Sequence, residues 1–520
     1  MVCGSRFLIN IANTFREHEI LLTGANGFLG KVIFGLLVDR YPDFKHLHVL
    51  IRPREDSSPQ ERFEREMLVA EPLAELVKRF GVSRLVDKTT VWGGDAADPH
   101  CGFEESDLVS LQGRIGLVLN CAGLVDFFAP LDQALRANVY SVQRVAALAQ
   151  RLDAKLLHVS TCYVAGCADG LVEETEPILG FYPRRQGSDD GRFDHVQELS
   201  ECRRGVEEIL QSKHSDDELE SRVRTKDQLI ASGRHRADKW GWVNTYTYTK
   251  SMGEQVLADI PDLDFTIVRP AIVESALRFP FAGWVEGGRT AAPLVLMALG
   301  GLKDWPVRRD IPLEVVPVDQ VAAATLVAGA LLLNGEHESV YQLATADINP
   351  LWLGELVELL VDEAEHLTKN GGSAARWLDP LPRLRFLDKE QAHFRKRQFE
   401  RKLRRIDGLV ASIQRRLGRY GRSPRSTLTA WRTSLRTLEL QLGFREQVLQ
   451  QYLPFIYDHR YIFEARRISE GYKKISTADR ELLCWSPEKI NWDSYWRNNQ
   501  IKGIRKWVEP EAVREWNFRI

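Results

Sequence analysis

The chain has 520 residues, of which 44% are hydrophobic, and a formal net charge of −2. This length and composition exclude an intrinsically disordered protein, and the near-neutral charge gives no electrostatic reason to expect a nucleic-acid partner. The seven cysteines have no CxxC spacing, so we expect reduced thiols, no metal site and a cytoplasmic location.

No stretch of the sequence predicts a signal peptide or a membrane span. The N-terminal apolar patch in MVCGSRFLINIANTFREHE is soon interrupted by polar and charged residues. The longest apolar runs, such as Val321 to Leu333, fall short of the roughly 20 residues that a spanning helix needs. Peripheral contact with a membrane surface stays open.

The segment ILLTGANGFLGKVIFGLLVDR, from Ile20 to Arg40, has the pattern of a buried strand, a glycine-rich turn and an amphipathic helix. Glycines recur there at intervals of three residues, which lets the backbone turn tightly and approach a pyrophosphate at the helix N-terminus. We therefore expect a dinucleotide site at this turn. Its predicted cofactor-binding residues are Thr23, Gly24, Asn26, Gly27, Phe28, Leu29 and Gly30.

Short apolar runs alternate with helical patterns between Ile20 and about Thr345. These runs are ILLT, LHVLIR, TTVWGGD, GLVLNCAG, LLHVST, FTIVRP and SVYQLAT. Strands that alternate with helices predict an α/β fold with a doubly wound, Rossmann-type parallel sheet. We assign residues 1–355 to this domain. A charged, helix-permissive insertion at about 183–243 either caps a substrate site or decorates the surface.

We assign residues 356–520 to a second, mostly helical domain, which contains the most basic part of the chain. Between Arg376 and Glu446 there are 19 Lys and Arg residues against seven Asp and Glu residues. The densest cluster consists of Arg395, Lys396, Arg397, Arg401, Lys402, Arg404 and Arg405. Such a run forms either a solvated helix face or a surface for an anionic membrane or for the phosphates of a large substrate.

The end of the second predicted strand, LIRPR, indicates which dinucleotide is bound. Arg52 lies 28 residues after Gly24, and Arg54 follows two residues later. A carboxylate at this position binds the ribose hydroxyls of NAD, whereas a guanidinium suits the 2′-phosphate of NADP. We therefore expect NADPH as the cofactor. Asp95, after the third strand, is expected either to accept a hydrogen bond from the adenine amine or to cap a turn.

Tyr246 and Lys250 have the spacing YxxxK in NTYTYTK, which places both side chains on one helix face. A nearby ammonium and the positive charge of a nicotinamide lower a tyrosine pKa from about 10 toward 7, as acid–base catalysis requires. Ser160 and Thr161 emerge from the C-terminal end of the predicted strand LLHVST. Together with the glycine turn, these residues predict an oxidoreductase site.

These residues resemble the extended short-chain dehydrogenase/reductase superfamily. A set of motifs narrows the resemblance to the alcohol-forming fatty acyl-CoA reductases over nearly the whole chain. They are TGANGFLGKV, NCAGLVDF, VSTCYVAG, NTYTYTK, IVRPAIVESAL, PFAGWVEG and VPVDQVA, with the ending NWDSYWRNNQIKGIRKWV. The resemblance implies NADPH-dependent reduction of a long-chain acyl-CoA to an aldehyde and then to a primary alcohol, with release of CoA.

The resemblance also implies roles for single residues. Thr161 bonds the reacting oxygen, Tyr246 donates the proton, and Lys250 orients the ribose and tunes the tyrosine. Asn138 either supports a proton relay through water or only packs against backbone. The other positions expected to bind the cofactor are Asn120, Ala122, Gly123, Pro270 and Ile272, besides Tyr246 and Lys250.

Two neighbours of Thr161 are interpreted as core residues. Cys162 follows Thr161 directly, and adjacent side chains of a strand point to opposite faces, so we expect packing rather than an acyl-enzyme. His158 is expected to be a satisfied core histidine. The chain departs from the family pattern at NCAG and at Ala271, where serine is common; both changes affect the expected pocket rather than the reaction type.

Three other functions stay open from the sequence. An acyl thioester reductase stops at the aldehyde, a sugar-nucleotide epimerase or dehydratase shares the sheet and the Thr/Tyr/Lys set, and a non-catalytic NADP-binding sensor retains the fold. Arg52 and the basic C-terminal domain speak against the epimerase, and the presence of Tyr246 and Lys250 speaks against the sensor. The sequence determines neither the preferred acyl length nor the oligomeric state.

Overall fold

The structure is a computed structural model that describes residues 8–185, 191–212, 218–288, 290–370, 384–416 and 448–510, with single positions between 429 and 446. The chain forms two compact units. The first comprises Met1–Thr290, Glu314–Pro350 and Tyr461–Trp507, and the second comprises Ala291–Leu313, Leu351–Arg460 and Val508–Ile520. This division differs from the expected boundary at residue 355, because residues 291–313 group with the second unit and residues 461–507 with the first.

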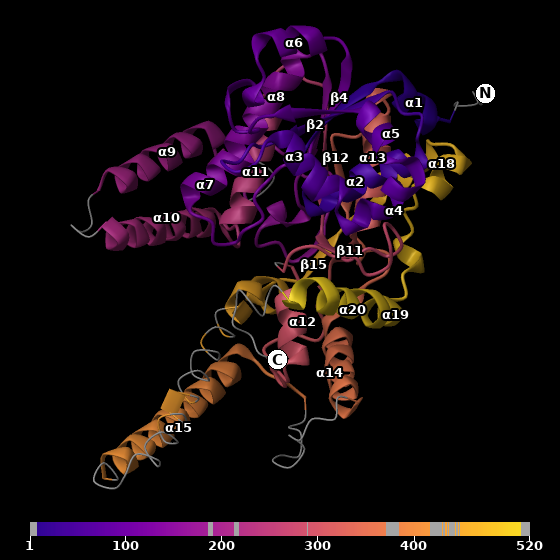
Figure 1. Ribbon diagram of the computed structural model, residues 1–520. Helices are drawn as coiled ribbons and strands as arrows, with labels where there is room; N and C mark the ends of the chain where they lie inside the picture. The colour runs from indigo at the N-terminus through magenta and orange to yellow at the C-terminus, as the bar shows by residue number, and fades with distance from the viewer. Residues whose placement is uncertain are drawn as a thin grey trace. The chain divides into compact units, whose positions relative to one another are not determined.

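The first unit is built on a parallel sheet whose described strands have the order β12-β7-β5-β4-β1-β2-β3 (Figure 1). These strands are β1 (Glu19–Thr23), β2 (His46–Ile51), β3 (Thr89–Gly93), β4 (Ile115–Asn120), β5 (Lys155–Val159), β7 (Phe265–Pro270) and β12 (Val340–Leu343). Each one overlaps an apolar run identified in the sequence, and all neighbouring pairs are parallel. The predicted doubly wound α/β fold is confirmed.

Helices cover both faces of this sheet, which is why its strands read as nearly continuous apolar runs. Successive residues of β4 show the two faces: Leu117 lies against α13 (Val318–Leu333), and Val118 shares a core with α8 (Ser141–Arg151). The other described α-helices of this unit outside the insertion are α1 (Ile11–Glu17), α2 (Phe28–Arg40), α3 (Pro59–Phe63), α4 (Glu71–Phe80), α5 (Val82–Asp87), α6 (Glu105–Leu111), α7 (Leu131–Leu135), α11 (Thr245–Ala258), α17 (Arg466–Lys473), α18 (Thr477–Leu482), α19 (Trp492–Tyr495) and α20 (Ile501–Gly503).

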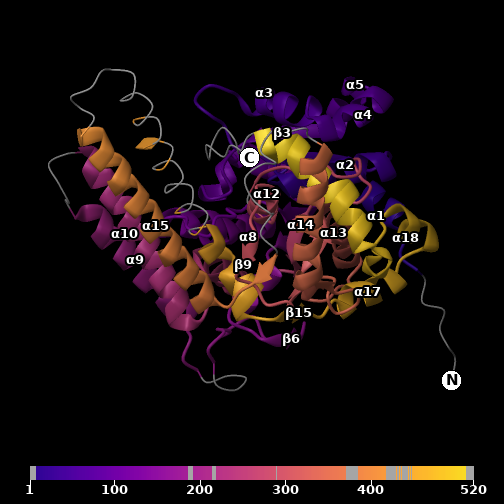
Figure 2. The same ribbon diagram turned by 90° about the horizontal axis from the view of Figure 1, so that it is seen from below.

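The expected insertion is a pair of helices, α9 (His195–Gln211) and α10 (Glu218–Trp240). Figures 1 and 2 both show the two helices side by side, extending away from the sheet. A buried polar contact joins α9 to α11: the Tyr248 hydroxyl donates a hydrogen bond to Glu198 Oε1 at 2.7 Å. The insertion is therefore attached to the helix that also carries Tyr246 and Lys250.

Residues 461–507 return to the first unit through a short parallel pair. Strand β15 (Tyr461–Phe463) pairs with β6 (Gly170–Val172), and Glu314 Oε1 accepts a hydrogen bond from the Phe463 N–H at 2.7 Å. The remaining short strands of this unit, β8 (Ile272–Glu274) and β11 (Val315–Pro317), pair in parallel with each other.

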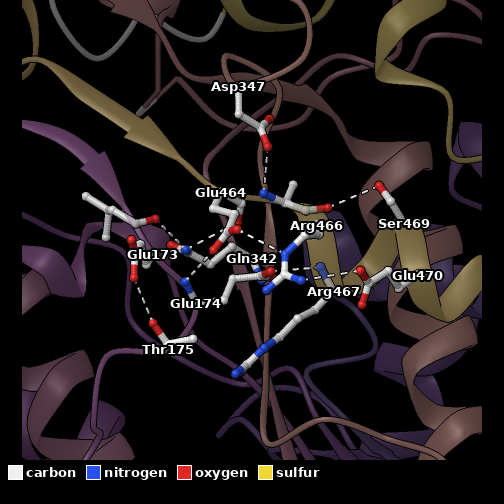
Figure 3. Close-up of polar contacts among 12 residues, drawn as sticks. Glu173, Glu174, Thr175, Gln342, Asp347, Glu464, Arg466, Arg467, Ser469 and Glu470 are labelled. Atoms are coloured by element: carbon white, nitrogen blue, oxygen red, sulfur yellow. Dashed lines mark hydrogen bonds and ion pairs between the residues drawn. The ribbon is translucent and has the colours of Figure 1, made fainter.

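Two carboxylates, from the buried Glu174 and the exposed Asp347, hold the start of this returning segment (Figure 3). Glu174 accepts hydrogen bonds from the backbone N–H groups of Gln342 at 2.9 Å and Arg467 at 2.7 Å, and Asp347 accepts one from Ala465 at 2.8 Å. Each carboxylate joins backbone segments that are far apart in the sequence. These bonds explain why residues 461–507 group with the sheet rather than with the helices that precede them.

The second unit is mostly helical, as predicted. Its described elements are α12 (Ala292–Leu299), β9 (Asp304–Trp305), β10 (Pro312–Leu313), β13 (Leu351–Trp352), α14 (Leu353–Asn370), β14 (Arg385–Phe386), α15 (Lys389–Arg416) and the π-helix η7 (Pro454–Asp458). The predicted basic cluster lies on α15, where all its members except Lys396, whose side chain lies outside the described residues, are exposed. None of the described helices combines the length and the apolar composition of a membrane span.

Candidate active site

The glycine turn between β1 and α2 has the geometry of a dinucleotide cradle. Gly24 has φ +67°, and a Cβ at this position would come within 2.8 Å of the Ala122 backbone nitrogen. At Gly30, a Cβ would collide with the Gly24 carbonyl oxygen, so helix and turn pack only because both residues are glycine. The three-residue glycine spacing is therefore explained by close backbone approach.

A cavity of about 980 Å³ opens in front of this turn. Five arginines line it: Arg52, Arg54, Arg62, Arg65 and Arg136. Of the predicted cofactor-binding residues, Thr23, Gly24, Asn26, Gly27, Arg52, Arg54, Asp95, Ala122 and Gly123 also line it, whereas Phe28, Leu29, Gly30, Asn120, Tyr246, Lys250, Pro270 and Ile272 are not in its lining. The cradle and the guanidinium groups fit a phosphate-bearing dinucleotide.

The loop that carries Arg52 and Arg54 is tied to the buried Arg62 and its partly buried partner Glu66 on the helical segment after it. Arg62, which is 5% exposed, donates a hydrogen bond to the Arg52 carbonyl oxygen. It also forms an ion pair with Glu66 at 2.8 Å. Burial opposes ionisation of Glu66, but hydrogen bonds from Arg62 and Asn26 and the charge of Arg54 outweigh it, so its pKa falls to about 2. This pair was not identified from the sequence, because nothing in the spacing of Arg62 and Glu66 distinguishes it from an ordinary helical ion pair.

Asp95 has the turn-capping arrangement that was one of its two predicted roles. Its Oδ1 accepts a hydrogen bond from the Ala97 N–H at 2.9 Å, and its Oδ2 lies 3.2 Å from Arg136 and 3.6 Å from Arg52. Burial opposes ionisation, but the Ala97 bond and Arg136 lower the pKa of Asp95 below its ordinary value. The adenine contact stays a prediction.

Thr161 and Tyr246 lie close together at the C-terminal end of the sheet, where the Thr161 hydroxyl donates a hydrogen bond to the Pro270 carbonyl at 3.3 Å. Burial raises the pKa of Tyr246 to about 12, against the opposing effect of Thr161. The Lys250 ammonium donates to the Val159 carbonyl at 2.7 Å and lies 3.4 Å from His158 Nε2, and the lowering toward 7 by Lys250 and the nicotinamide stays a prediction. The phenol therefore holds its proton at neutral pH, which is the state that a proton donor needs.

Ser160 is also buried beside Thr161, and its hydroxyl has no hydrogen-bond partner in the part of the chain that the structure describes. A buried hydroxyl without a partner costs free energy unless a bound group supplies one. The site therefore contains a buried hydroxyl that can bond a substrate or cofactor group.

Asn138 lies in the π-helix η3 (Arg136–Tyr140), and its amide is fully engaged. Its Oδ1 accepts a hydrogen bond from the Leu124 N–H at 2.9 Å, and its Nδ2 donates to the Leu124 carbonyl and the Thr249 hydroxyl, both at 3.1 Å. This arrangement matches the packing alternative. A relay role stays a prediction.

Cys162 is buried, as expected, but for a different reason. Strand β5 ends at Val159, and residues Cys162–Ala165 form a 3-10 helix, so the strand argument about opposite faces was wrong. The thiol donates to the Arg269 carbonyl at 2.8 Å, and burial raises its pKa well above its ordinary value. A protonated, fully engaged thiol is a poor nucleophile.

The fold and this site define a dinucleotide-binding protein of Rossmann type. The chain belongs to the male sterility protein family, whose sequence model matches residues 22–325. It is 27% identical to the probable fatty acyl-CoA reductase 5 of Arabidopsis thaliana over 95% of this chain and 98% of that protein. It is 30% identical to the alcohol-forming fatty acyl-CoA reductase of Simmondsia chinensis over 70% of this chain and 72% of that protein. The predicted membership in the fatty acyl-CoA reductase family is confirmed, and with it a nicotinamide dinucleotide cofactor.

Among solved structures, the reductase domain of a nonribosomal peptide synthetase from Mycobacterium tuberculosis is similar to this chain. The match covers 91% of both chains at 16% identity, with a TM-score of 0.47. At this level of similarity it carries no argument about function.

Proposed function

We propose that this protein reduces long-chain acyl-CoA thioesters with NADPH, first to the aldehyde and then to the primary alcohol, and releases CoA. The observation that carries the proposal is that Thr161 and a protonated Tyr246 lie close together at the end of the sheet, with Lys250 one helical turn after Tyr246. Lys250 Nζ lies next to Gly123, which lines the dinucleotide cavity. The names of the relatives support acyl-CoA as the substrate.

The preference for NADPH over NADH rests on Arg52 and Arg54. Their side chains are 69% and 55% exposed and line the cavity, and each lies 3.6 Å from one carboxylate oxygen rather than in a tight bidentate pair. Both guanidinium groups can therefore turn to a phosphate without giving up a strong bond. A 2′-phosphate is the group that distinguishes the two cofactors.

The chain's own residues handle the charge that develops on the substrate oxygen. The bound cofactor supplies a hydride to the thioester carbonyl carbon. Thr161 and Tyr246 then stabilise the oxygen, and Tyr246 donates its proton to give a hemithioacetal, which expels the CoA thiol and leaves the aldehyde. The same pair serves the aldehyde oxygen in the second reduction. Lys250 holds the ribose, and its ammonium stabilises the phenolate that Tyr246 becomes until a proton from solvent restores the phenol for the second reduction.

The stoichiometry of the reaction tests this proposal. Purified protein is incubated with palmitoyl-CoA and NADPH, cofactor oxidation and free thiol are measured, and the product is identified by chromatography. We expect two NADPH oxidised per thiol released and hexadecanol as the product. One NADPH per thiol with aldehyde as the product identifies an aldehyde-forming reductase, and no thiol release refutes the acyl-CoA assignment.

We also propose that the basic cluster of α15 contacts an anionic membrane surface or the phosphates of acyl-CoA. Its exposed guanidinium groups lie beside exposed apolar side chains of the same helix, Phe394, Ile406, Leu409 and Ile413. A helix with cations and apolar side chains on its exposed surface suits an interface between water and lipid.

A further inference from the structure

A chain of buried polar side chains connects the glycine turn to Lys250. The Thr23 hydroxyl lies 2.6 Å from Asn120 Oδ1, Asn120 Nδ2 lies 3.1 Å from His158 Nδ1, and His158 Nε2 lies 3.4 Å from Lys250 Nζ. All four residues are at most 4% exposed. They come from the ends of β1, β4 and β5 and from α11.

We propose that His158 is a positioning residue of the reductase site, which holds the Lys250 ammonium in place and couples its charge to the glycine turn through Asn120 and Thr23. This inference rests on the proposed function of Lys250. It replaces the interpretation of His158 as a core histidine without further role.

Burial makes the pairing of His158 necessary. An imidazole in an apolar strand between Leu157 and Val159 costs free energy unless both ring nitrogens have partners. Here the partners are Asn120 and Lys250. Burial first, and the charge of Lys250 second, lower the pKa of His158 well below its ordinary value, so the ring is neutral and carries one N–H.

A single N–H allows two arrangements of hydrogens on the same heavy atoms. In the first, Asn120 Nδ2 donates to His158 Nδ1, so the ring hydrogen is on Nε2 and faces a neutral Lys250 amine. In the second, the Asn120 amide is turned over, Nδ1 donates to its oxygen, and Nε2 accepts from the Lys250 ammonium.

The second arrangement also changes the glycine turn. The Ala122 N–H already donates to the Thr23 hydroxyl oxygen at 3.2 Å. Once Asn120 Nδ2 also donates to that oxygen, the Thr23 hydroxyl hydrogen is free to point into the dinucleotide cavity that Thr23 lines. A charged Lys250 and a Thr23 donor for the cofactor therefore occur together.

The other ionisable groups around Lys250 do not replace His158. Burial lowers the pKa of Lys250 to about 8, with Glu254 and Cys121 acting in the opposite direction. Glu254, however, is held by Arg269 in an ion pair of 2.5 Å. Burial also raises the pKa of Cys121 to about 12, so its thiol is neutral at pH 8. Without His158, the ammonium keeps the Val159 carbonyl as its close acceptor.

The test compares three substitutions of His158. Leu removes both ring nitrogens and so both hydrogen bonds. Asn keeps only a polar group that faces Asn120. Gln places an amide oxygen near the position of Nε2, which faces Lys250. NADPH dissociation constants are measured by fluorescence from pH 6 to 9.5, without substrate, and the pH profile of kcat with palmitoyl-CoA is measured beside them.

We expect His158→Leu and His158→Asn to move the alkaline midpoint of NADPH binding to lower pH by about one unit, the size expected for losing one hydrogen bond to a charged donor. His158→Gln should restore the midpoint to within about 0.3 units. The control is His48→Leu, since His48 is equally buried, has both ring nitrogens paired with Glu19 and Trp92, and lies on β2 away from Lys250.

The proposal is overturned if the Leu and Gln variants have the same midpoint, or if His48→Leu shifts it as much as His158→Leu. If His158→Leu is too unstable to purify, the difference in the alkaline midpoint of NADPH binding between His158→Asn and His158→Gln decides the question alone. If the wild-type protein binds NADPH with the expected midpoints but does not reduce palmitoyl-CoA, the proposed function fails while this inference stands.

Discussion

At the scale of single residues, the arginines of the dinucleotide cavity differ in how much freedom they have. Arg62 is buried and bound to both Glu66 and the Arg52 carbonyl, so it holds the loop. Arg52 is 69% exposed and is 3.6 Å from Asp95. An exposed, loosely paired guanidinium on a loop that Arg62 holds is the arrangement expected of a residue that recognises an incoming phosphate.

The first prediction concerns cofactor selectivity. Arg52→Ala removes a charged hydrogen bond of roughly 1.5 to 3 kcal/mol, so we expect NADPH binding to weaken by about tenfold to a hundredfold and NADH binding to change little. Dissociation constants for both cofactors, measured by fluorescence titration, check this. Arg151→Ala, a surface variant that loses a pair with Glu105 outside the cavity, is the control. Equal losses for NADPH and NADH would show that Arg52 does not read the phosphate.

The second prediction concerns proton donation. Tyr246→Phe removes the hydroxyl of the proposed proton donor beside Thr161, so we expect turnover to fall by at least about a hundredfold with NADPH affinity nearly unchanged. Tyr248→Phe, on the same helix, is the matched control: its hydroxyl bonds Glu198 and fastens the insertion. That variant should lose thermal stability while keeping most of its turnover. Near-normal turnover in Tyr246→Phe would refute the assignment.

Some of these residues were predictable and others were not. Thr161, Tyr246 and Lys250 lie at fixed positions after a strand or along one helix, so local spacing is enough to find them. The partners of Lys250 are set by tertiary contacts, because His158 and Asn120 belong to neighbouring strands whose pairing no local pattern gives. The bonds of the Lys250 ammonium to Val159 and His158 were for this reason not expected from the sequence.

At the scale of elements, the sheet was predictable because buried parallel strands are apolar runs separated by helical periods. The return of residues 461–507 was not. Strand β15 has only three residues, and its partner β6 is equally short and lies far earlier in the chain. This pairing is held by the buried carboxylates of Glu174 and Glu314, which accept hydrogen bonds from backbone N–H groups. A single Glu in a sequence has no local pattern that predicts such a role.

Asp319, at the start of α13, gives the third prediction. Its carboxylate accepts hydrogen bonds from three consecutive N–H groups, those of Leu277, Arg278 and Phe279, at 2.8 to 3.0 Å. Asp319→Asn places an amide N–H₂ against these donors and leaves at least one of them unpaired, so we expect a loss of about 1 to 3 kcal/mol of unfolding free energy.

Chemical denaturation of the variant measures this loss. Asp493→Asn serves as the control, since Asp493 is 68% exposed and makes only a surface pair with Arg497. An Asp319→Asn protein as stable as the control would mean that the backbone segment does not depend on the carboxylate.

At the scale of the whole molecule, the fourth prediction concerns the pH at which the protein is most stable, which buried ionisable groups determine. Burial raises the pKa of Glu174 and of Glu314 to about 7. Their contribution to stability is therefore present below pH 4.5 and is lost as the pH rises through 7. Among the described residues, five histidines have a pKa below their ordinary 6.5, chiefly through burial, and their contribution is lost as the pH falls below 6.5. They are His18, His46, His48, His158 and His337.

The glutamates make stability fall as the pH rises, and the histidines make it fall as the pH drops. We therefore expect the thermal unfolding temperature, measured from pH 5 to 8.5, to be highest at about pH 6.5. The double variant Glu174→Gln and Glu314→Gln should flatten the decline above pH 6.5 and make the rise between pH 5 and 6.5 steeper, because the two glutamates act between pH 4.5 and 7. A decline toward alkaline pH that persists in this variant would assign it to other groups.

The last prediction concerns the basic cluster of α15, which the net charge of −2 conceals. An acyl-CoA carries several phosphate charges at one end, and an anionic membrane presents many, so either target attracts the same cations. Raising the ionic strength from 0.05 to 0.5 M shortens the Debye length from about 14 Å to about 4 Å. We expect the KM for palmitoyl-CoA to rise, or binding to phosphatidylserine vesicles to be lost, across this range.

Replacing Arg395, Arg397, Arg401 and Arg404 with Glu should produce the same effect at low salt. The control changes the same number of charges at exposed positions of α10, Arg222, Arg224, Lys226 and Arg234. If the α15 variant folds and keeps both its KM and its vesicle binding, or if the α10 variant loses them equally, the cluster is a solvated helix face and the charge that matters is that of the whole protein.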